Sequence, residues 1–293
     1  MSYKILDKKQ LSGSVFEMTI DAPEIARKAH AGQFFVLRVN ECGERVPFTF
    51  SDWSAEEGWI RFIFMRVGKT THLLEHLHSH ESICDVAGPL GHPTATASGS
   101  TWTEGTAIKK GDHLVVVGGG VGVAVAYPVA RAAVEAGSVV TVIAGARNEE
   151  LLILMDELKA LDLEELIIVT DDGSAGREGL VTEPLRELCA SGSVDRVFVV
   201  GPAIMMKFCS TTTAQYDIPT QASLNPIMVD GTGMCGACRI QVGGKTQFGC
   251  VEGPDFDAHE VDWEELMSRQ RVYAEQERLS DGEFLRACSC YDR

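Results

Sequence analysis

Hydrophobic positions in the first third of the chain form short runs separated by turn residues, with the aromatic and β-branched content of strands. The predicted strands cover residues 15–20, 34–39, 59–65 and 82–86. Residues 70–78 predict one helix between them, with Thr70 or Thr71 available as the N-cap. Antiparallel strands in this number usually close on themselves, so residues 1–97 are predicted to form a small antiparallel β-barrel or sandwich.

The pattern changes after a segment rich in Ser, Thr and Gly at 94–110, which is typical of a linker or a surface excursion. From Asp112 onward, apolar runs alternate with helical stretches, the pattern of parallel strands with covering helices. The predicted strands are 113–117, 139–144, 166–170 and 196–200, and the helices are about 118–135, 149–161 and 182–189. Residues 98–218 are therefore predicted to form a doubly wound α/β domain.

The last part of the chain, residues 219–293, is predicted to be a small third domain. It begins with a strand near Pro219, continues into a glycine-rich stretch with several cysteines, and ends with an acidic helix from Asp262 to about Glu277. With 293 residues, the chain is long enough to give two or three domains a core each.

Composition and charge narrow the classes of function. The chain has 26 Lys and Arg against 42 Asp and Glu, and this net charge of −16 argues against nucleic acid, whose phosphates need a basic surface. The first residues lack the apolar core of a signal peptide, and the longest apolar run, 114–130, carries glycines and Pro128. We therefore predict neither a signal peptide nor a membrane span. Nine cysteines, three of them in one motif, indicate metal ligation in a reducing cytoplasm rather than a disulfide framework.

The cysteine motif is the most informative feature of the third region. Cys235, Cys238 and Cys250 have the spacing C-x2-C-x11-C, and Asp230 stands five residues before the first of them. Thiolates at such spacings, among glycines that let the backbone fold over a cofactor, are typical of an iron–sulfur cluster. Zinc is a weaker alternative, because structural zinc favours paired C-x2-C units or Cys/His sets and His259 lies nine residues past the last cysteine. Three plain buried cysteines are the weakest alternative.

The motif resembles the C-x4-C-x2-C…C loop of [2Fe-2S] proteins, with Asp230 in place of the first cysteine. We therefore predict a [2Fe-2S] cluster on the three cysteines, with Asp230 as the fourth ligand. A carboxylate oxygen is a harder ligand than a thiolate, so its main effect should be on the reduction potential.

Two further strings lie in the barrel region, RVPFTFS at 45–51 and FMRVGKTT at 64–71. The second has Ile63 where a phosphate loop needs glycine, so it is not a Walker A sequence. Its glycine turn still offers backbone N–H groups to a pyrophosphate at a helix N-terminus. The string HLLEH at 72–76 spells a zinc-protease element, but a partly exposed helix with surface histidines explains it better.

A glycine-rich turn, GGGVG at 118–122, follows a predicted strand and opens a helix, the context in which diphosphates bind. Its spacing differs from G-x-G-x-x-G, and no acidic residue ends the second strand, so the sequence does not choose between NAD and NADP. Further turns, TDDGS at 170–174 and GPAIMM at 201–206, follow later strands. Each turn alone could be a simple chain reversal, but their joint occurrence in this order favours cofactor binding.

Together with the turn GPLG at 88–91, these strings resemble the ferredoxin-reductase-like flavoproteins. The resemblance implies FAD in the barrel and NAD(H) on the α/β domain, although many relatives have a tyrosine where this chain has Pro47. The residues implied at the flavin ring and ribityl chain are Arg45, Pro47, Phe48 and Thr49. Those implied at the ribityl chain and diphosphate are Phe64, Met65, Arg66, Gly68, Thr70 and Thr71. Those implied at the nicotinamide nucleotide are Gly118, Gly119, Gly120, Val121, Gly122, Asp171, Gly201, Pro202 and Met205.

Over nearly the whole chain, this order of parts resembles two related kinds of subunit. One is the electron-transfer subunit of dihydroorotate dehydrogenase, which has four cysteines at its cluster. The other is the small subunit of NADH-dependent reduced ferredoxin:NADP oxidoreductase, also known as the sulfide dehydrogenase beta type. In this second kind the first ligand is Asp, and the strings DGTGMCGACR at 230–239 and VDWEEL at 261–266 match it.

The second resemblance implies an oxidoreductase subunit that passes a hydride of NAD(P)H and single electrons through FAD and the cluster, with no catalytic side chain. It also implies a heterodimer or larger assembly with a larger FAD/iron–sulfur subunit, electron bifurcation, and ferredoxin reached indirectly. A dihydroorotate dehydrogenase partner and a zinc-binding interaction module remain as alternatives. Cys84, Cys288 and Cys290 have no assigned role.

Overall fold

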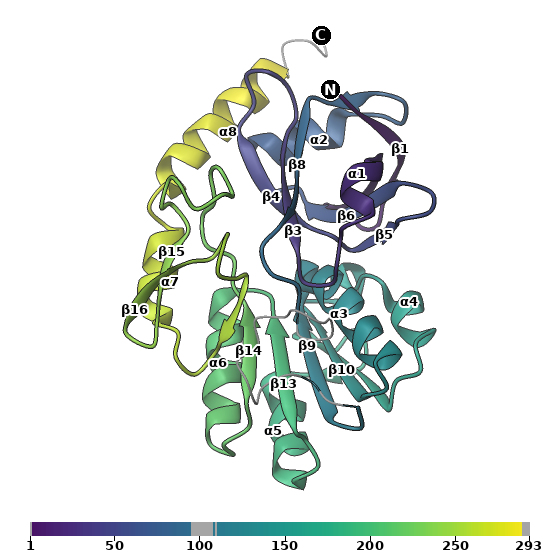
Figure 1. Ribbon diagram of the computed structural model, residues 1–293, viewed down its shortest axis with the longest axis vertical. Helices are drawn as coiled ribbons and strands as arrows, with labels where there is room; N and C mark the ends of the chain where they lie inside the picture. The colour runs from purple at the N-terminus through teal and green to yellow at the C-terminus, as the bar shows by residue number, and fades with distance from the viewer. Residues whose placement is uncertain (1, 95–107, 109, 289–293) are drawn as a thin grey trace.

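The N-terminal strands form two antiparallel sheets around an aromatic core (Figure 1). The computed structural model describes residues 2–94, 108 and 110–288, so most of the predicted linker and Cys290 lie outside the described residues. The five-stranded sheet has the order β5-β6-β2-β1-β7 and the three-stranded sheet the order β4-β3-β8. The strands are β1 (Tyr3–Gln10), β2 (Val15–Asp21), β3 (Phe34–Arg38), β4 (Arg45–Thr49), β5 (Asp52–Ser54), β6 (Trp59–Met65), β7 (Ser82–Ile83) and β8 (Asp85–Leu90).

Closely packed aromatic rings fill this barrel. The ring centroid of Phe35 lies 5.0 Å from that of Phe50 and 5.3 Å from that of Phe62, and all three side chains are fully buried. Offset and edge-to-face pairs of this kind add stability beyond the area that they bury. Two short helices, α1 (Pro23–Ala26) and α2 (Lys69–His76), complete this part of the molecule and confirm the predicted antiparallel barrel with one principal helix.

The central part of the chain is a seven-stranded sheet of order β12-β11-β10-β9-β13-β14-β17, parallel except for its last strand. Its strands are β9 (His113–Gly119), β10 (Val139–Ala146), β11 (Glu165–Thr170), β12 (Arg177–Glu178), β13 (Arg196–Val200), β14 (Thr220–Ser223) and β17 (Asp255–Asp257). The helical segments are η1 (Gly120–Gly122), α3 (Val123–Glu135), η2 (Glu149–Leu151), α4 (Met155–Lys159), α5 (Thr182–Ser191) and α6 (Ala203–Ala214).

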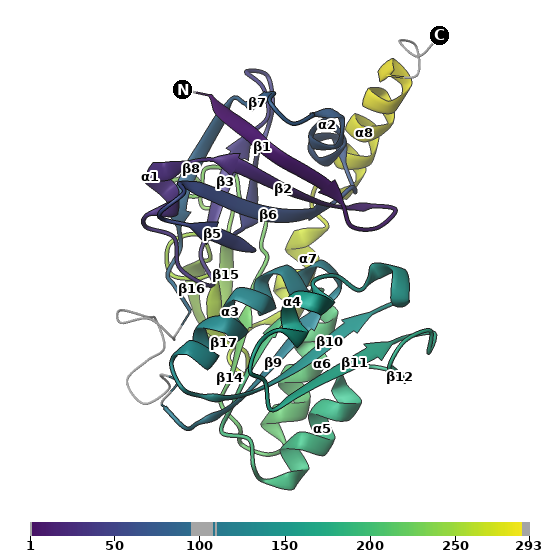
Figure 2. The ribbon, with the colours of Figure 1, turned by 90° about the vertical axis from the view of Figure 1, so that its right-hand side faces the viewer.

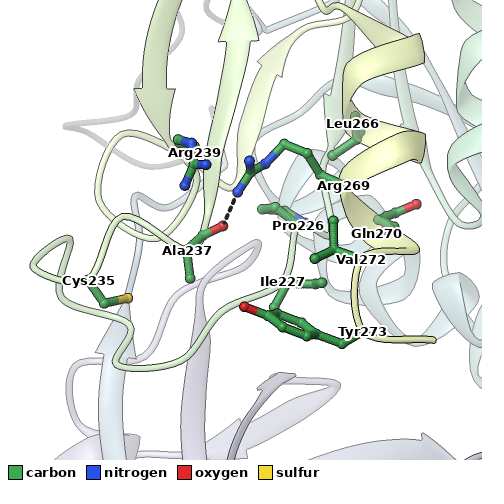
Figure 3. Close-up of a pocket in the computed structure, with 10 residues that line it drawn as sticks. All are labelled: Pro226, Ile227, Cys235, Ala237, Arg239, Leu266, Arg269, Gln270, Val272 and Tyr273. Carbon is green, nitrogen blue, oxygen red and sulfur yellow. Dashed lines mark hydrogen bonds between the residues drawn. The ribbon is translucent and has the colours of Figure 1, made fainter. Parts of the chain in front are cut away.

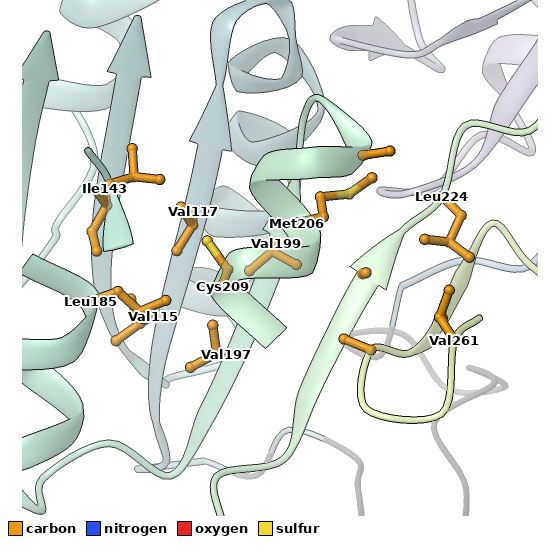
Figure 4. Close-up of a cluster of buried hydrophobic side chains, with 14 of the residues drawn as sticks. Val115, Val117, Ile143, Leu185, Val197, Val199, Met206, Cys209, Leu224 and Val261 are labelled. Atoms are coloured by element: carbon orange, nitrogen blue, oxygen red, sulfur yellow. The ribbon is translucent and has the colours of Figure 1, made fainter. Parts of the chain in front are cut away.

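Alternating residues of the buried strands serve the two faces of this sheet. Val115 and Val117 of β9 pack in the cluster under α5 and α6, which Figure 4 shows, whereas Leu114 and Val116 pack in the cluster under α3. Because apolar side chains are needed on both faces, the strands read as continuous hydrophobic runs. Chain order reverses beside β9, whose neighbours are β10 and β13, and this confirms the predicted doubly wound sheet.

Two predicted helices have different extents in the structure. The prediction of one helix over 149–161 is wrong, because η2 and α4 are separated at Leu154, whose backbone has a φ of +57°. A left-handed residue cannot continue a right-handed helix, and the neighbouring Ile153 is buried in the core. The acidic tail is likewise two helices, α7 (Trp263–Gln270) and α8 (Ala274–Cys288), rather than one.

The C-terminal part contains a loop with the cysteine motif, the hairpin β15 (Arg239–Val242) and β16 (Lys245–Phe248), and then α7 and α8. β14 and β17 lie beyond residue 218, where the second domain was predicted to end, yet they extend the central sheet. Figures 1 and 2 show α8 running back beside α2 of the barrel, where Nε2 of His72 is 3.5 Å from Oδ1 of Asp281. Within the described ranges, no helix combines the length and the apolar character needed to cross a membrane.

Candidate functional site

The strand β4, predicted at the flavin ring, lies at the edge of the three-stranded sheet. It pairs with β3 so that Thr49 is opposite Phe34, Phe48 opposite Phe35, and Pro47 opposite Val36. The ring centroid of Phe48 lies 5.1 Å from that of Phe62 in the aromatic core. All four predicted residues keep some exposure, since Arg45 is exposed and Pro47, Phe48 and Thr49 are half-buried. This strand therefore packs Phe48 against the aromatic core and keeps exposed surface at the predicted position of the flavin.

The turn before α2, predicted at the FAD diphosphate, is held by Thr71. Its Oγ1 accepts hydrogen bonds from the N–H groups of Val67 (2.9 Å) and Gly68 (3.0 Å), and donates one to the carbonyl of Gly68 (2.8 Å). The Thr71 hydroxyl therefore fixes the shape of the turn, and the first N–H groups of the helix remain available to the predicted diphosphate.

The other residues predicted near this diphosphate flank the turn. Phe64 is buried and its ring stacks on Phe16, with centroids 5.6 Å apart, whereas Met65 is exposed. Arg66 lies with Nη1 2.6 Å from Oε1 of Glu75, and Thr70 is buried in the first turn of α2.

Two glycines of the turn at 118–122 pass very close to neighbouring residues. A Cβ atom on Gly119 would lie 2.3 Å from Sδ of Met205, and one on Gly122 would lie 2.6 Å from the carbonyl oxygen of Val200. The contact at Gly122 is with backbone, so glycine is required there, whereas a Cβ at Gly119 would have to displace the flexible thioether of Met205.

The structure brings the predicted nucleotide residues to one edge of the sheet, where β9 and β13 end. The β9–β13 pairing sets Val200 opposite Gly118, so the turn with Gly120 and Val121 lies beside Gly201, Pro202 and Met205. Asp171 follows β11 on the same edge, exposed and two strands away from β9. Crevices at such a switch point, outside the carboxyl ends of the strands, are where nucleotides bind in open α/β sheets.

Asp230 organises the loop that carries the cysteines. Its Oδ1 accepts a hydrogen bond from the N–H of Thr232 (2.9 Å) and its Oδ2 accepts one from the N–H of Cys235 (3.1 Å). The backbone N–H of Thr232 is the main cause that lowers the pKa of Asp230 below its ordinary value, because it favours the ionised form. The carboxylate thus spans the first part of the loop, and its role as a cluster ligand stays a prediction.

Two of the three motif thiols meet in the interior. Sγ of Cys238 lies 3.1 Å from Sγ of Cys250, and these residues are only 1% and 2% exposed. Cys235 is exposed on the glycine-rich part of the loop, which Figure 3 shows beside α7. Over residues 2–94, 108 and 110–288, no group of three or more His, Cys, Asp or Glu side chains converges as a metal site.

The donor set nevertheless fits an iron–sulfur cluster. Burial raises the pKa of Cys250, so the thiolate form that binds metal needs a compensating positive centre there. Positive φ angles at Gly231 (75°), Gly233 (83°) and Gly236 (67°) let the backbone curl around the position between the thiols. Three thiolates that bind one cluster explain these thiols and the curled glycine backbone better than unliganded cysteines do.

The thiol pair packs directly against the barrel. Cys238 and Cys250 share one small buried cluster with Phe34 and Val36 of β3, and Leu90 of β8 packs against it. A Cβ atom on Gly231 would come within 2.8 Å of Leu90, so the loop lies tightly on these strands. The predicted cluster position therefore adjoins the sheet that contains β4, the predicted flavin strand.

Several residues around these sites carry no signal in the local sequence. Arg269 of α7 donates a hydrogen bond from Nη2 to the carbonyl of Ala237, 32 residues earlier, which no spacing rule predicts. Asp255 is buried where the barrel exit meets the edge of the central sheet, and its Oδ2 accepts a 2.5 Å hydrogen bond from Thr94. Among the described residues the zinc-protease string gains no third ligand, and Nδ1 of His76 lies 2.6 Å from the carbonyl oxygen of His72.

Comparison with known proteins defines the class. A family model described as the iron–sulfur cluster binding domain of dihydroorotate dehydrogenase B matches residues 225–262, and one described as an oxidoreductase NAD-binding domain matches residues 116–211. Together with the fold, these two family models define an NAD-linked oxidoreductase subunit with an iron–sulfur domain. A ferredoxin NADP⁺ reductase from Neisseria gonorrhoeae shares the fold, with a TM-score of 0.58 at 16% identity over 76% of this chain and 98% of the other.

Whole-chain relatives give the family. A homolog of the electron transfer subunit of dihydroorotate dehydrogenase B (NAD⁺) from Thermotoga maritima is 44% identical over 97% of this chain and 95% of its own length. The electron transfer subunit from Desulforamulus reducens is 30% identical over 89% of this chain and 97% of its own. The chain belongs to the family of dihydroorotate dehydrogenase B electron transfer subunits and their homologs.

A solved structure matches nearly the whole length of this chain. It is a chain of the NADH-dependent reduced ferredoxin-NADP oxidoreductase, a structure described for its insights into flavin-based electron bifurcation. The identity is 43%, the TM-score is 0.88, and the match covers 97% of this chain and 98% of the other. The predicted resemblance to these two related kinds of subunit is confirmed.

Proposed function

We propose that this chain is an FAD- and [2Fe-2S]-containing subunit that exchanges hydride with NAD(H) and single electrons with a larger partner subunit. One structural observation carries the proposal: the buried thiols of Cys238 and Cys250 share a packed cluster with strands β3 and β8 of the barrel. A cluster on these thiols would adjoin the predicted flavin site, which suits electron transfer over a short distance. When bound, FAD converts between hydride transfer and single-electron transfer, and the cluster carries single electrons.

The chain's own residues would bind and orient these groups. β4 would present Arg45, Pro47 and Thr49 to the flavin ring, while the aromatic core behind Phe48 excludes water from that side. The N-terminus of α2 would hold the diphosphate of FAD, and the glycine turn after β9 would hold that of the nicotinamide nucleotide. No side chain need act as an acid or base.

A partner subunit is supported by the surface around the cysteine loop. Met234 is 89% exposed, and Val229 and Val251 are also exposed large apolar residues on this stretch. Apolar side chains gathered at one site are typical of protein–protein interfaces, so we place the docking surface for the larger FAD/iron–sulfur subunit here. Electron bifurcation, with NAD(P)H and ferredoxin reached through that partner, and a cytoplasmic location complete the proposal.

A dihydroorotate dehydrogenase partner is the second candidate, because relatives at 28–44% identity are named as its electron transfer subunit or a homolog. Asp230 distinguishes the two candidates, since a cysteine at this position is expected of the dihydroorotate dehydrogenase kind. Copurification of the chain with its native partner, followed by identification of that polypeptide, decides between them.

The cofactor content tests the proposal itself. Anaerobically purified protein should contain about one FAD and about two iron atoms with acid-labile sulfide per chain. Zinc without flavin would contradict the proposal and restore the zinc-binding interaction module.

A further inference from the structure

Two guanidinium groups meet at the short turn between the first two cysteines of the motif. Nη1 of Arg239 donates a 3.1 Å hydrogen bond to the carbonyl of Gly236, and Nη2 of Arg269 donates one of 3.1 Å to the carbonyl of Ala237. Gly236 and Ala237 are the two residues that separate Cys235 from Cys238. Figure 3 shows both arginines close together beside this turn.

Arg269 is fixed in place by the packing of α7. The helix is capped by Asp262, whose Oδ1 accepts a 3.0 Å hydrogen bond from the N–H of Glu265. Trp263 and Leu266 are buried on its inner face, which sets the direction in which the last turn projects Arg269. The guanidinium thus reaches the cysteine turn from a separate, anchored element, across a cavity of about 300 Å³.

Both cations lack a carboxylate partner. Among the described residues, the ion pairs involve other arginines, and neither Arg239 nor Arg269 has an acidic oxygen within 4.0 Å. The whole chain carries a net charge of −16, yet these two cations lie beside the cysteine turn with no acidic side chain from the described part of the chain to neutralise them. Unpaired cations near thiolates favour negative charge at that position.

We propose that Arg239 and Arg269 are positioning residues of the iron–sulfur centre. They hold the turn between Cys235 and Cys238, and their charge favours the reduced state of the cluster. The reduction potential of such clusters is set by net charge, hydrogen bonding and solvent exposure, so loss of one cation makes reduction harder. This inference rests on the proposed function, because it needs a cluster on the loop.

Three variants test the inference in the full-length protein. Arg269→Gln removes the charge and the guanidinium, while Arg269→Lys keeps the charge. Arg271→Gln is the matched control, since Arg271 is exposed just beyond the same helix and makes only backbone hydrogen bonds. Each protein is purified anaerobically, its iron and sulfide are measured, and its midpoint potential is determined by a titration followed by EPR spectroscopy.

We expect Arg269→Gln to weaken the reduced state about tenfold, a shift of about 59 mV to more negative potential for a one-electron centre. Arg271→Gln and Arg269→Lys should stay close to the unsubstituted protein. If Arg269→Gln loses its iron while Arg271→Gln keeps it, the positioning role is supported. The effect of the charge is then measured as the midpoint potential of Arg239→Gln.

Equal potentials in the unsubstituted protein and in Arg269→Gln would overturn the inference, as would equal shifts in Arg269→Gln and Arg271→Gln. A lower melting temperature with an unchanged potential would show a merely structural role and would overturn it too. Absence of iron from the unsubstituted protein is a different result, because it refutes the proposed function itself.

Discussion

Replacing Asp255 with asparagine tests how a buried carboxyl group joins the barrel to the central sheet. Asp255 begins β17, is opposite Ser223 of β14, and accepts a hydrogen bond from Thr94 at the exit of the barrel. Burial raises its pKa to about 6 from an ordinary value of 3.8, and the hydroxyls of Thr94 and Ser223 offset only part of that effect.

The magnitude follows from linkage between protonation and folding. A folded-state pKa raised to about 6 means that the folded protein binds the proton more tightly than the unfolded chain. The stabilising contribution of protonated Asp255 is therefore complete below about pH 4 and is lost as the pH rises through about 6. At about 1.4 kcal/mol per pKa unit, the total loss is about 3 kcal/mol, and about half of it develops between pH 5 and 8.

Asp255→Asn removes this titration, so the variant should gain stability relative to the unsubstituted protein as the pH rises from 5 to 8. The assay is urea unfolding at several pH values, with the difference in unfolding free energy plotted against pH. Asp156→Asn is the control, because that side chain is 98% exposed and the same substitution should give a flat difference. A flat difference for Asp255→Asn, or one that falls with pH, would refute the reasoning.

Two substitutions test the cofactor sites. Gly122→Ala places a Cβ 2.6 Å from the carbonyl oxygen of Val200, so we expect a loss of about 1–3 kcal/mol in stability and at least about tenfold weaker NADH binding by fluorescence titration. Gly13→Ala, with nothing within 4 Å of the new Cβ, should leave both unchanged, and equal behaviour of the two variants would contradict the glycine argument. Cys238→Ser should lose most of its iron and retain FAD, both measured by absorbance. The control Cys42→Ser, at an exposed cysteine, should retain both cofactors. A full iron content in Cys238→Ser would exclude this thiol as a ligand.

The fold was predictable where one local pattern dominates. The strands of the central sheet read as apolar runs because both of their faces are buried, and glycine turns mark the edge at which they end. β1 was missed because its sequence, YKILDKKQ, fully buries only Ile5 and leaves most of its charged residues exposed. The break at Leu154 was missed because a leucine rarely adopts a left-handed conformation, and only tertiary packing of its neighbours imposes it.

The sites were predictable to the extent that each is a contiguous string. The cysteine motif and the glycine turn at 118–122 are local, and the structure shows why their residue types are needed. Arg269 and Asp255 act on these parts from distant elements, so their roles depend on how the helices and strands pack. A single sequence contains no signal for such contacts, and only the assembled chain reveals them.

The central claim is that electrons of NADH reach the cysteine loop through the flavin. Its most direct test is EPR spectroscopy of anaerobic protein mixed with NADH, with and without FAD. We expect a one-electron signal of a reduced [2Fe-2S] cluster in the FAD-loaded protein and none in protein stripped of FAD. No cluster signal from the FAD-loaded protein, or an equal signal without FAD, would contradict the account.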